Sequence, residues 1–345
     1  MKRYDWIIVG GSFAGLATAR QLTGWGLLID QKPIGEHQTS ACGTLLEVPM
    51  ALGIDEAVVQ VHHRLVLHIR GLEIDFPSPY PFCVVDYKTL CTRLAESGNF
   101  DFLLAHVIRR DGNVVVTTQG EFEAEILVDA SGWKAVLTPS TPPNNFYNMG
   151  VETVLPGSGV GLHFFYEGKK TQRIYWIFPA GETLRVGAGC FFGRGAIKTP
   201  LFSFLRANAL PEVNHGLHGN AFPFVLREPV VDGVFRVGDA AGHCFALTGE
   251  GIRPAIYFGT LLGRILRRVV EGEITLNYAQ HLYQDLVRKK RKAYRLLTTF
   301  QRTLTAIPDR VLAFASKMAS SRSEYFLERY RRIFDFQHLD DILRG

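Results

Sequence analysis

The stretch Val9-Gly10-Gly11-Ser12-Phe13-Ala14-Gly15 decides how the first part of this chain folds. The apolar run at 6–9 before it predicts a buried strand, and residues 16–22 after it predict a helix. The stretch Leu27-Leu28-Ile29-Asp30 predicts another strand. A strand, a helix and a strand in this order form a parallel unit with a right-handed crossover, which is the repeating element of α/β folds.

The small residues of this stretch indicate a phosphate-binding turn. Gly10 permits a tight exit from the strand, Gly15 lets helix and strand pack closely, and position 12 must allow the backbone to approach a pyrophosphate. The N-terminus of the helix adds free N–H groups that attract an anion. Ser12 stands where the dinucleotide fingerprint has glycine, and it is small enough to preserve such a site. The residues expected to line the turn are Gly10, Gly11, Ser12, Phe13, Ala14 and Gly15.

An acidic residue follows the turn at the distance that nucleotide binding requires. Asp30 lies 20 residues after Gly10, at the end of the next predicted strand, where a carboxylate accepts hydrogen bonds from a ribose diol. Gln31 beside it is also expected to bind the cofactor. A glycine turn without a ligand is the simpler alternative. The strand before the turn, the helix after it and the acid together favour a nucleotide, although the first crossover is short.

A second glycine turn occurs late in the chain. The apolar strand predicted at 234–237 ends in Gly238-Asp239, and a glycine-rich segment at 247–252 precedes a helix predicted from Gly251 to Glu271. An acid at the end of a strand followed by a glycine-rich helix start is another anion-friendly arrangement. An ordinary strand followed by a turn is the alternative.

These two segments carry a family resemblance. Gly-Asp-Ala-Ala-Gly at 238–242 followed by Leu-Thr-Gly-Glu-Gly-Ile at 247–252 resembles the flavin-binding signature of the geranylgeranyl reductase family, within the class built like para-hydroxybenzoate hydroxylase. The resemblance implies that FAD is the cofactor and that Asp239 contacts its ribityl chain. It also implies cofactor contacts, at the pyrimidine end of the flavin and beside Asp239, by Gly238, Gly249, Gly251 and Ile252.

Other stretches resemble the same family in the same order, over roughly residues 5–265. Residues 32–35 with Cys42-Gly43 resemble the segment after the ribose acid, and Val84-Val85-Asp86-Tyr87 resembles a Val-Val-Asp-Arg motif with Tyr87 in place of the arginine. Residues 128–132 resemble the turn that covers the nucleotide, so Gly132 is expected at the cofactor. Tyr175-Trp176-Ile177-Phe178-Pro179 resembles a motif that lines the substrate cavity, and implies substrate contacts by Tyr175, Trp176, Phe178 and Pro179.

The chemistry of that family requires an apolar cavity and a proton source. A reduced flavin there saturates isolated double bonds of prenyl chains. Further aromatic residues are candidates for the cavity, although aromatic residues on strands more often fill cores: Phe164, Phe165, Phe191, Phe192, Phe222 and Phe224.

Two residues are candidates for a catalytic role. Cys42, which the resemblance places with Gly43 over the flavin, is a candidate proton donor or substrate gate, with a small buried hydrophobe as the alternative. His243 is a candidate for a hydrogen bond to flavin or substrate, although a capping or solvent-facing histidine is the simpler interpretation.

The expected fold is α/β: a Rossmann-like FAD-binding domain with a mostly parallel sheet, an interleaved substrate domain with an antiparallel sheet, and a helical C-terminus broken at Pro308. Short strands are predicted at 65–69 and 72–76, and more at 161–166, 173–178 and 183–191. The expected boundaries are 1–60, 80–138 and 230–268 for the FAD-binding domain, 61–79 and 139–229 for the substrate domain, and 269–345 for the helical segment.

Composition restricts location and partners. The five cysteines are scattered, with no CxxC pair, so neither a disulfide framework nor a metal site is expected, and a reducing cytoplasm fits. No apolar run is long enough to span a membrane. Of a net charge of +5, residues 264–332 contribute 16 Lys and Arg against 6 Asp and Glu. The cluster 288–292 beside apolar helical residues predicts either peripheral contact with an anionic membrane or a solvated helix face, whereas no motif supports nucleic-acid binding.

The sequence thus predicts an FAD-dependent oxidoreductase that reduces carbon–carbon double bonds of an isoprenoid or other apolar substrate, either a small molecule or a lipid. An FAD-dependent monooxygenase acting on an apolar or aromatic substrate needs the same cofactor site and is the first alternative. A non-catalytic flavin- or lipid-binding protein is the second. No second dinucleotide fingerprint is present, so the expected electron donor is NAD(P)H visiting transiently or a reduced carrier such as ferredoxin.

Overall fold

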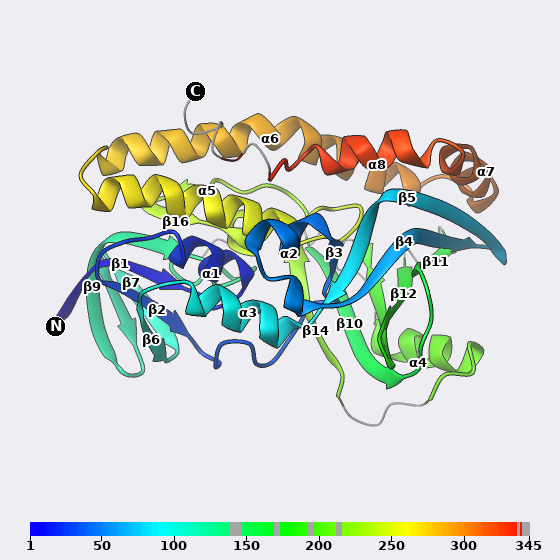
Figure 1. The fold of residues 1–345 in the computed structure, drawn as a ribbon, viewed down its shortest axis with the longest axis horizontal. Coiled ribbons are helices and arrows are strands. Elements are labelled where there is room, and N and C mark those ends of the chain that lie inside the picture. Colours follow the sequence, from blue (N-terminus) through cyan, green and yellow to red (C-terminus); the bar gives the residue numbers. More distant parts are fainter. Residues whose placement is uncertain (139–146, 169–172, 192–195, 212–215, 337–338, 340–345) are drawn as a thin grey trace.

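Two large sheets lie side by side, and long helices cross both of them along one side of the molecule (Figure 1). The computed structural model describes residues 1–138, 147–168, 173–191, 196–211, 216–336 and 339. The arrangement confirms the predicted α/β class, with one mostly parallel and one mostly antiparallel sheet.

The first sheet contains the N-terminal strand–helix–strand unit. Its main path runs β15-β16-β9-β1-β2-β6, and all neighbours from β16 to β6 pair in parallel. A hairpin, β7-β8, joins the sheet through β9. The strands are β1 (Lys2–Val9), β2 (Gly26–Asp30), β6 (Asp101–Leu104), β7 (Val107–Asp111), β8 (Val114–Thr117), β9 (Gly120–Asp129), β15 (Val230–Val231) and β16 (Val234–Arg236).

The second sheet runs β14-β10-β13-β12-β11-β4-β5-β3 and is antiparallel except where β11 pairs with β4. One face packs against helix α4 (Lys198–Ala207) and forms its own apolar cluster with Val186, Tyr175 and Leu201. The other face joins the main core. The strands are β3 (Gly43–Leu45), β4 (Val58–Ile69), β5 (Leu72–Val85), β10 (Tyr147–Pro156), β11 (Leu162–Gly168), β12 (Arg173–Ala180), β13 (Thr183–Cys190) and β14 (His218–Pro223).

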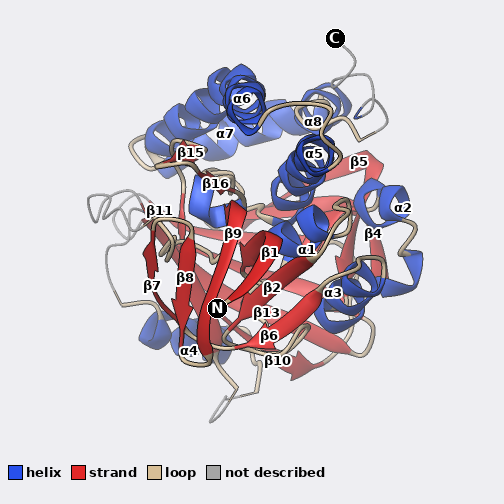
Figure 2. Cartoon of the chain, turned by 90° about the vertical axis from the view of Figure 1, so that its left-hand side faces the viewer, coloured by secondary structure: helices blue, strands red, loops and turns tan. Residues whose placement is uncertain are grey.

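Helices cover the first sheet and continue over the second (Figures 1 and 2). Gly259 and Gly263 of α5 allow it to approach α1 closely, because a Cβ atom at Gly259 would lie 2.7 Å from the Ala14 carbonyl oxygen. No helix among the described residues combines the length and the apolar character needed to cross a bilayer. The helices are α1 (Phe13–Ala19), α2 (Glu47–Leu52), α3 (Tyr87–Glu96), α5 (Ile252–Val270), α6 (Leu276–Leu304), α7 (Asp309–Ser320) and α8 (Ser323–Arg331), with short 3₁₀ turns η1 (Asp55–Ala57) and η4 (Gly238–Ala241).

Several predicted elements differ in extent from those observed. The strands expected at 65–69 and 72–76 are the ends of much longer strands, because β4 and β5 pair from Val58 to Val85. The helix expected at 16–22 begins at Phe13, where Ser12 supplies an extended N-cap, and ends at Ala19. The break at Pro308 is confirmed, and further breaks separate α5 from α6 and α7 from α8. The division into domains stays a prediction.

Candidate functional site

The first glycine turn has no room for side chains at two positions. Gly10 has a φ of +115°, and a Cβ atom there would lie 2.2 Å from the Ala130 carbonyl oxygen. A Cβ atom at Gly15 would lie 1.9 Å from the Gly10 carbonyl oxygen. Both glycines are therefore required by the turn, as the sequence predicts, and Ala130 comes from the 128–132 segment expected to cover a nucleotide.

Ser12 and Tyr87, the two residues that differ from the motifs of the resembled family, contact each other. The Tyr87 hydroxyl donates a hydrogen bond to Ser12 Oγ at 3.1 Å and accepts one from Lys32 Nζ at 3.0 Å. Burial raises the pKa of Tyr87 and lowers the pKa of Lys32. Ser12 makes no side-chain cap to α1, so its hydroxyl leaves the first N–H groups of the helix unblocked. Ser12 and Tyr87 form one unit with a lysine that sequence reasoning had not assigned.

Asp30 is held by backbone donors at the end of β2. One of its carboxylate oxygens accepts a hydrogen bond from Gly11 N at 2.5 Å, and the other accepts one from Lys32 N at 3.0 Å. These contacts fix the carboxylate beside the first turn. Gln31 is exposed to solvent.

The second turn lies directly against the first. Gly238 has a φ of +66°, and a Cβ atom there would lie 2.7 Å from the Ala14 Cβ, so β16 ends at the first turn of α1. Within the described residues, the Asp239 carboxylate has no hydrogen-bond partner. Burial raises the pKa of Asp239 to about 6, and the charge of Arg227 acts in the opposite direction. An acceptor of this kind beside two glycine turns is available to a ligand with hydroxyl groups.

His243 is fully buried, so the solvent-facing interpretation of this residue is wrong. Its ring stacks on Phe258 at 3.9 Å between centroids, and its Nδ1 accepts a hydrogen bond from Gly238 N at 3.1 Å. Burial lowers the pKa of His243 to about 3, so the ring is neutral at physiological pH. The ring stabilises the Gly238-Asp239 turn.

The segment 247–252 is clamped by a buried arginine. Arg253 is fully buried and makes two hydrogen bonds to the Glu250 carboxylate. It also donates to the carbonyl oxygens of Tyr330 and Arg331 at the C-terminal end of α8. Gly249 has a φ of +65°, and a Cβ atom there would lie 3.6 Å from the Phe222 ring on the second sheet. Gly251 and Ile252 begin α5 at the same place, so this segment connects the first sheet's turns to the second sheet.

One face of the second sheet combines aromatic and charged side chains. Strand register places Phe164 opposite Trp176, and both Trp176 and Glu152 opposite Gly187. Directly paired residues share a face, so these side chains line one surface. This surface is called the cavity face, because the family resemblance predicts the substrate cavity at Trp176 and Phe178. The Trp176 ring lies flat on β13, because a Cβ atom at Gly187 would lie 2.0 Å from that ring.

Not every predicted cavity residue lies on this face. Tyr175 stacks on Phe204 of α4 at 4.5 Å between centroids, on the opposite side of the sheet, and Phe165 contacts Phe204 there as well. Phe178 contacts Phe164 on the cavity face, whereas the Pro179 carbonyl oxygen pairs with His62. Phe191 and Phe224 are buried, and Phe192 lies outside the described residues.

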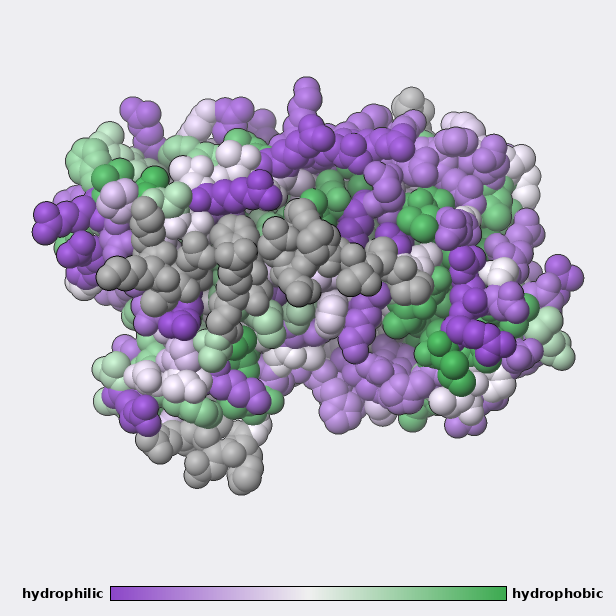
Figure 3. Space-filling view, turned by 180° about the vertical axis from the view of Figure 1, so that it is seen from behind, coloured by the Kyte–Doolittle hydropathy of each residue, from purple (hydrophilic) through white to green (hydrophobic). Residues whose placement is uncertain are grey.

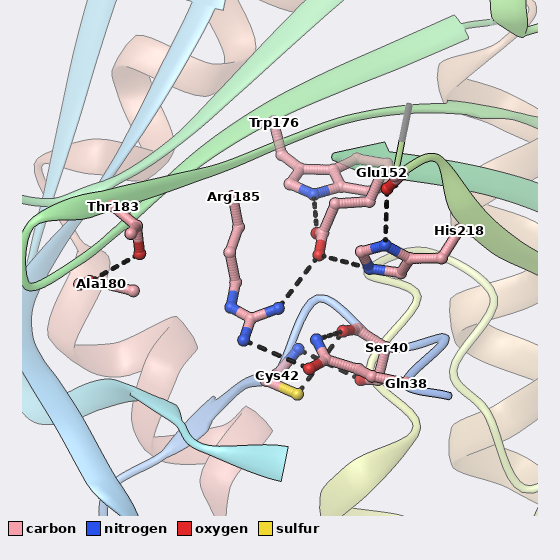
Figure 4. Close-up of polar contacts among 10 residues, drawn as sticks. Gln38, Ser40, Cys42, Glu152, Trp176, Ala180, Thr183, Arg185 and His218 are labelled. Atoms are coloured by element: carbon pink, nitrogen blue, oxygen red, sulfur yellow. Dashed lines mark hydrogen bonds and ion pairs between the residues drawn. The ribbon is translucent and has the colours of Figure 1, made fainter. Parts of the chain in front are cut away.

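The charged side chains of the cavity face form a network that sequence reasoning missed (Figure 4). Glu152 accepts hydrogen bonds from Trp176 Nε1 at 2.8 Å and from Arg185 Nη1 at 3.2 Å, and pairs with His218 Nε2 at 3.2 Å. Arg185 interrupts an apolar strand, Thr183–Cys190, and such a residue was the available signal. Four strands contribute to the network: β10, β12, β13 and β14.

Cys42 lies at the edge of this network in a constrained conformation. It is fully buried with a φ of +58°, and its Sγ donates to the Ser40 carbonyl oxygen at 3.5 Å. A Cβ atom at the next residue, Gly43, would lie 3.2 Å from the Phe178 ring. Burial raises the pKa of Cys42 to about 12, and Arg185 acts in the opposite direction. The structure thus brings Cys42 and Gly43 to the cavity face, while Gly132 follows β9 beside the first turn.

Comparisons with known proteins find similar sequences over much of the chain. No family model matches the chain. It is 29% identical to digeranylgeranylglycerophospholipid reductase 2 of Methanopyrus kandleri over 329 residues, which cover 82% of this chain and 81% of that protein. It is 33% identical to digeranylgeranylglycerophospholipid reductase of Methanococcus vannielii over 143 residues, but these span only 36% of that protein and 39% of this chain.

Solved structures show the same fold. A geranylgeranyl bacteriochlorophyll reductase-like protein of Thermoplasma acidophilum has a TM-score of 0.82 at 17% identity, covering 99% of this chain and all of that one. PqsL of Pseudomonas aeruginosa, a probable FAD-dependent monooxygenase, has a TM-score of 0.70 at 16% identity, covering 92% of this chain and all of that one.

Proposed function

We propose that this chain, a member of the geranylgeranyl reductase family by sequence and fold, is an FAD-dependent oxidoreductase that saturates carbon–carbon double bonds of an isoprenoid lipid. The observation that carries the proposal is the meeting of three parts. Two glycine turns meet at the start of α1, and the segment 247–252 leads from there to an apolar face that holds Cys42.

The residues present fit FAD. Gly10 and Gly15 lie where any Cβ atom would close the turn, and Asp30 and Asp239 are carboxylates at strand ends, suited to a ribose and a ribityl chain. Gly249, Gly251 and Ile252 would face the pyrimidine end of the flavin. When bound, FAD supplies two-electron hydride chemistry, and the protein supplies orientation and electrostatics.

The chain's own residues would bind the substrate and hold a proton. Phe164, Trp176 and Phe178 present an apolar surface that excludes water and accommodates a prenyl chain. Because the pKa of Cys42 is raised to about 12, its Sγ keeps its proton near neutral pH. A protonated thiol is the form that can act as a general acid toward a substrate carbon.

The test is to purify the protein and measure its absorbance in the flavin bands. The protein is then reduced anaerobically and incubated with an unsaturated archaeal-type diether phospholipid. We expect product that gains two hydrogens for each saturated bond, as seen by mass spectrometry. A colourless protein that cannot be reconstituted with FAD would overturn the proposal. Comparing NADH, NADPH and reduced ferredoxin as reductants identifies the donor.

A monooxygenase is the second candidate, because PqsL has the same fold. The two functions differ in their need for oxygen. A hydroxylated product that forms only in air, together with NAD(P)H consumption, would favour the monooxygenase. Saturated product formed without oxygen would favour the reductase.

We also propose that α7 brings the protein to an anionic membrane, where a lipid substrate resides. Its inner face packs Leu312 and Ala313 against β4 and β5, while Val311, Phe314 and Met318 are exposed at helical spacing. Figure 3 shows apolar residues gathered at this end of the molecule with hydrophilic residues around them. Exposed Arg310 and Lys317 flank the apolar stripe. An apolar stripe with basic neighbours suits an anionic bilayer surface.

The basic cluster 288–292 is less available for this contact than its sequence predicts. Lys290 is partly buried, donates to the Ile333 carbonyl oxygen at 2.6 Å, and lies over the rings of Tyr257 and Phe334. Arg288 and Arg291 pair with Glu228. Co-sedimentation with phosphatidylglycerol vesicles tests α7: Phe314→Ser is expected to weaken binding, whereas Lys289→Ser is expected to have a smaller effect. Equal losses in the two variants would contradict a contact through α7.

A further inference from the structure

A buried ion pair lies on the otherwise apolar cavity face. Glu152 is 3% exposed and Arg185 is 9% exposed, and their charged groups are 3.2 Å apart. Two charges in an apolar site cost free energy through desolvation, and an apolar pair of similar size would fill the same space. The pair therefore calls for a role other than packing.

A chain of hydrogen bonds connects this pair to Cys42 (Figure 4). Arg185 Nη2 donates to Gln38 Oε1 at 3.4 Å, and Gln38 Nε2 donates to the Ser40 carbonyl oxygen at 2.6 Å. That same carbonyl oxygen accepts from Cys42 Sγ, while Ser40 Oγ accepts from Cys42 N at 3.1 Å. The side chain of Arg185 thus connects the segment 38–42 to β13 of the second sheet.

Cys42 needs such support. A non-glycine residue with a φ of +58° is held in a sparsely populated conformation and persists only where its surroundings fix it. On its other side, the Cys42 carbonyl oxygen accepts a hydrogen bond from Val85 N at 3.0 Å, which anchors it to β5. The thiol is therefore placed between β5 and the Arg185 network.

We propose that Glu152 and Arg185 are positioning residues for Cys42. Together they orient its thiol toward the reacting double bond, and Arg185 stabilises the thiolate that remains after proton transfer. This inference rests on the proposed function. In the step, one alkene carbon accepts a hydride from reduced FAD, which is thereby oxidised, and the neighbouring carbon accepts the proton of Cys42. The π bond breaks, two C–H bonds form, and solvent returns the proton to the sulfur.

The charges around Cys42 give the two positioning residues opposite effects. Arg185 favours the thiolate and Glu152 disfavours it. Other ionisable groups near the sulfur come from α3 and its N-cap: Asp86, Tyr87 and Cys91. His218, which is partly exposed, pairs with Glu152 Oε1, the same oxygen that accepts a hydrogen bond from Arg185.

The test measures the pH dependence of Cys42 alkylation by iodoacetamide in FAD-loaded protein without substrate, resolved by peptide mass spectrometry. Arg185→Met is expected to move the alkylation profile to higher pH, and Glu152→Gln to lower pH. In turnover, Arg185→Met is expected to lower kcat by about tenfold to a hundredfold with a smaller change in KM. Arg185→Lys, which keeps the charge, is expected to restore part of that loss.

Val186→Ala is the matched control, because Val186 is the next residue on β13 and its side chain packs on the opposite face. It is expected to lower stability without moving the alkylation profile. Shifts in the same direction for Arg185→Met and Glu152→Gln, or no shift while FAD stays bound, would overturn the inference. Opposite shifts in a protein that reduces no isoprenoid would support the positioning role and count against the proposed function alone.

Discussion

The nucleotide turns and the cavity face of the second sheet are built from different parts of the chain. The turns are made by the backbone, and side chains are excluded from Gly10, Gly15 and Gly238. The cavity face is made by side chains, with Glu152 and Arg185 brought together from separate strands. A backbone site depends on space and tolerates chemical change beside it. A side-chain network depends on each partner, because every lost contact leaves a buried polar group unsatisfied.

The largest expected effect breaks the backbone site. In Gly15→Val the new side chain begins with a Cβ atom 1.9 Å from the Gly10 carbonyl oxygen, so the turn cannot form as it stands. We expect FAD retention to be lost, measured as flavin absorbance per protein after gel filtration. Gly112→Asn is the control, because a Cβ atom there meets nothing within 4 Å and asparagine tolerates the φ of +57° at this position. Normal flavin content in Gly15→Val would show that the turn tolerates side chains.

The second effect tests a carboxylate within the backbone site. The pKa of Asp239 is raised to about 6 in the folded protein from an ordinary value of 3.8, so the stability it contributes is present below pH 3.8 and is lost as pH rises through 6. The difference corresponds to about 3 kcal/mol. In apoprotein, Asp239→Asn is expected to raise Tm at pH 7.5 relative to the unsubstituted chain, and much less near pH 4.

The same variant is expected to bind FAD more weakly, by about tenfold, because a charged acceptor is replaced by an amide. Titration of apoprotein with FAD, followed by quenching of flavin fluorescence, gives this number. Unchanged affinity together with an unchanged pH profile would remove Asp239 from the cofactor site.

The third effect tests the side-chain network. Trp176→Phe removes the donor to Glu152 Oε2 while keeping an aromatic ring over Gly187. One buried carboxylate oxygen is then left unsatisfied, at a cost of about 1–3 kcal/mol in the free energy of unfolding. Urea denaturation measures that cost. Phe164→Leu is a control on the same face, and it changes packing without removing a hydrogen bond.

The smallest expected effect comes from a side-chain contact beside the first glycine turn. It tests whether side chains as well as the backbone contribute to the nucleotide site. Tyr87→Phe removes the hydroxyl between Ser12 and Lys32, at an expected cost of about 0.5–1.5 kcal/mol in FAD affinity. Ser12→Gly with Tyr87→Arg restores the family pattern and is expected to bind FAD better than the sum of the two single variants predicts. Strict additivity would show that the two positions act independently.

The difference between backbone turns and a side-chain network also explains how much of each region could be predicted from the sequence. The turn at 9–15 and the turn at 238–242 were predictable because glycines in a fixed local order can serve few other purposes. Tyr175 could not be assigned from sequence, because alternate residues of one strand face opposite sides and the motif does not say which side is the cavity. Glu152, Arg185 and Gln38 were not predictable together, because their meeting depends on strand register between β10, β13 and the loop before β3.

The clamp between Arg253 and α8 also sets an order of events during synthesis. Arg253 donates to the carbonyl oxygen of Tyr330, which is 77 residues later in the chain. A ribosome releases the turns, Asp239 and the segment 247–252 well before it releases α8. The segment therefore reaches its final packing only when translation has passed residue 331. Assembly of the complete cofactor site is then expected to wait for the synthesis of α8.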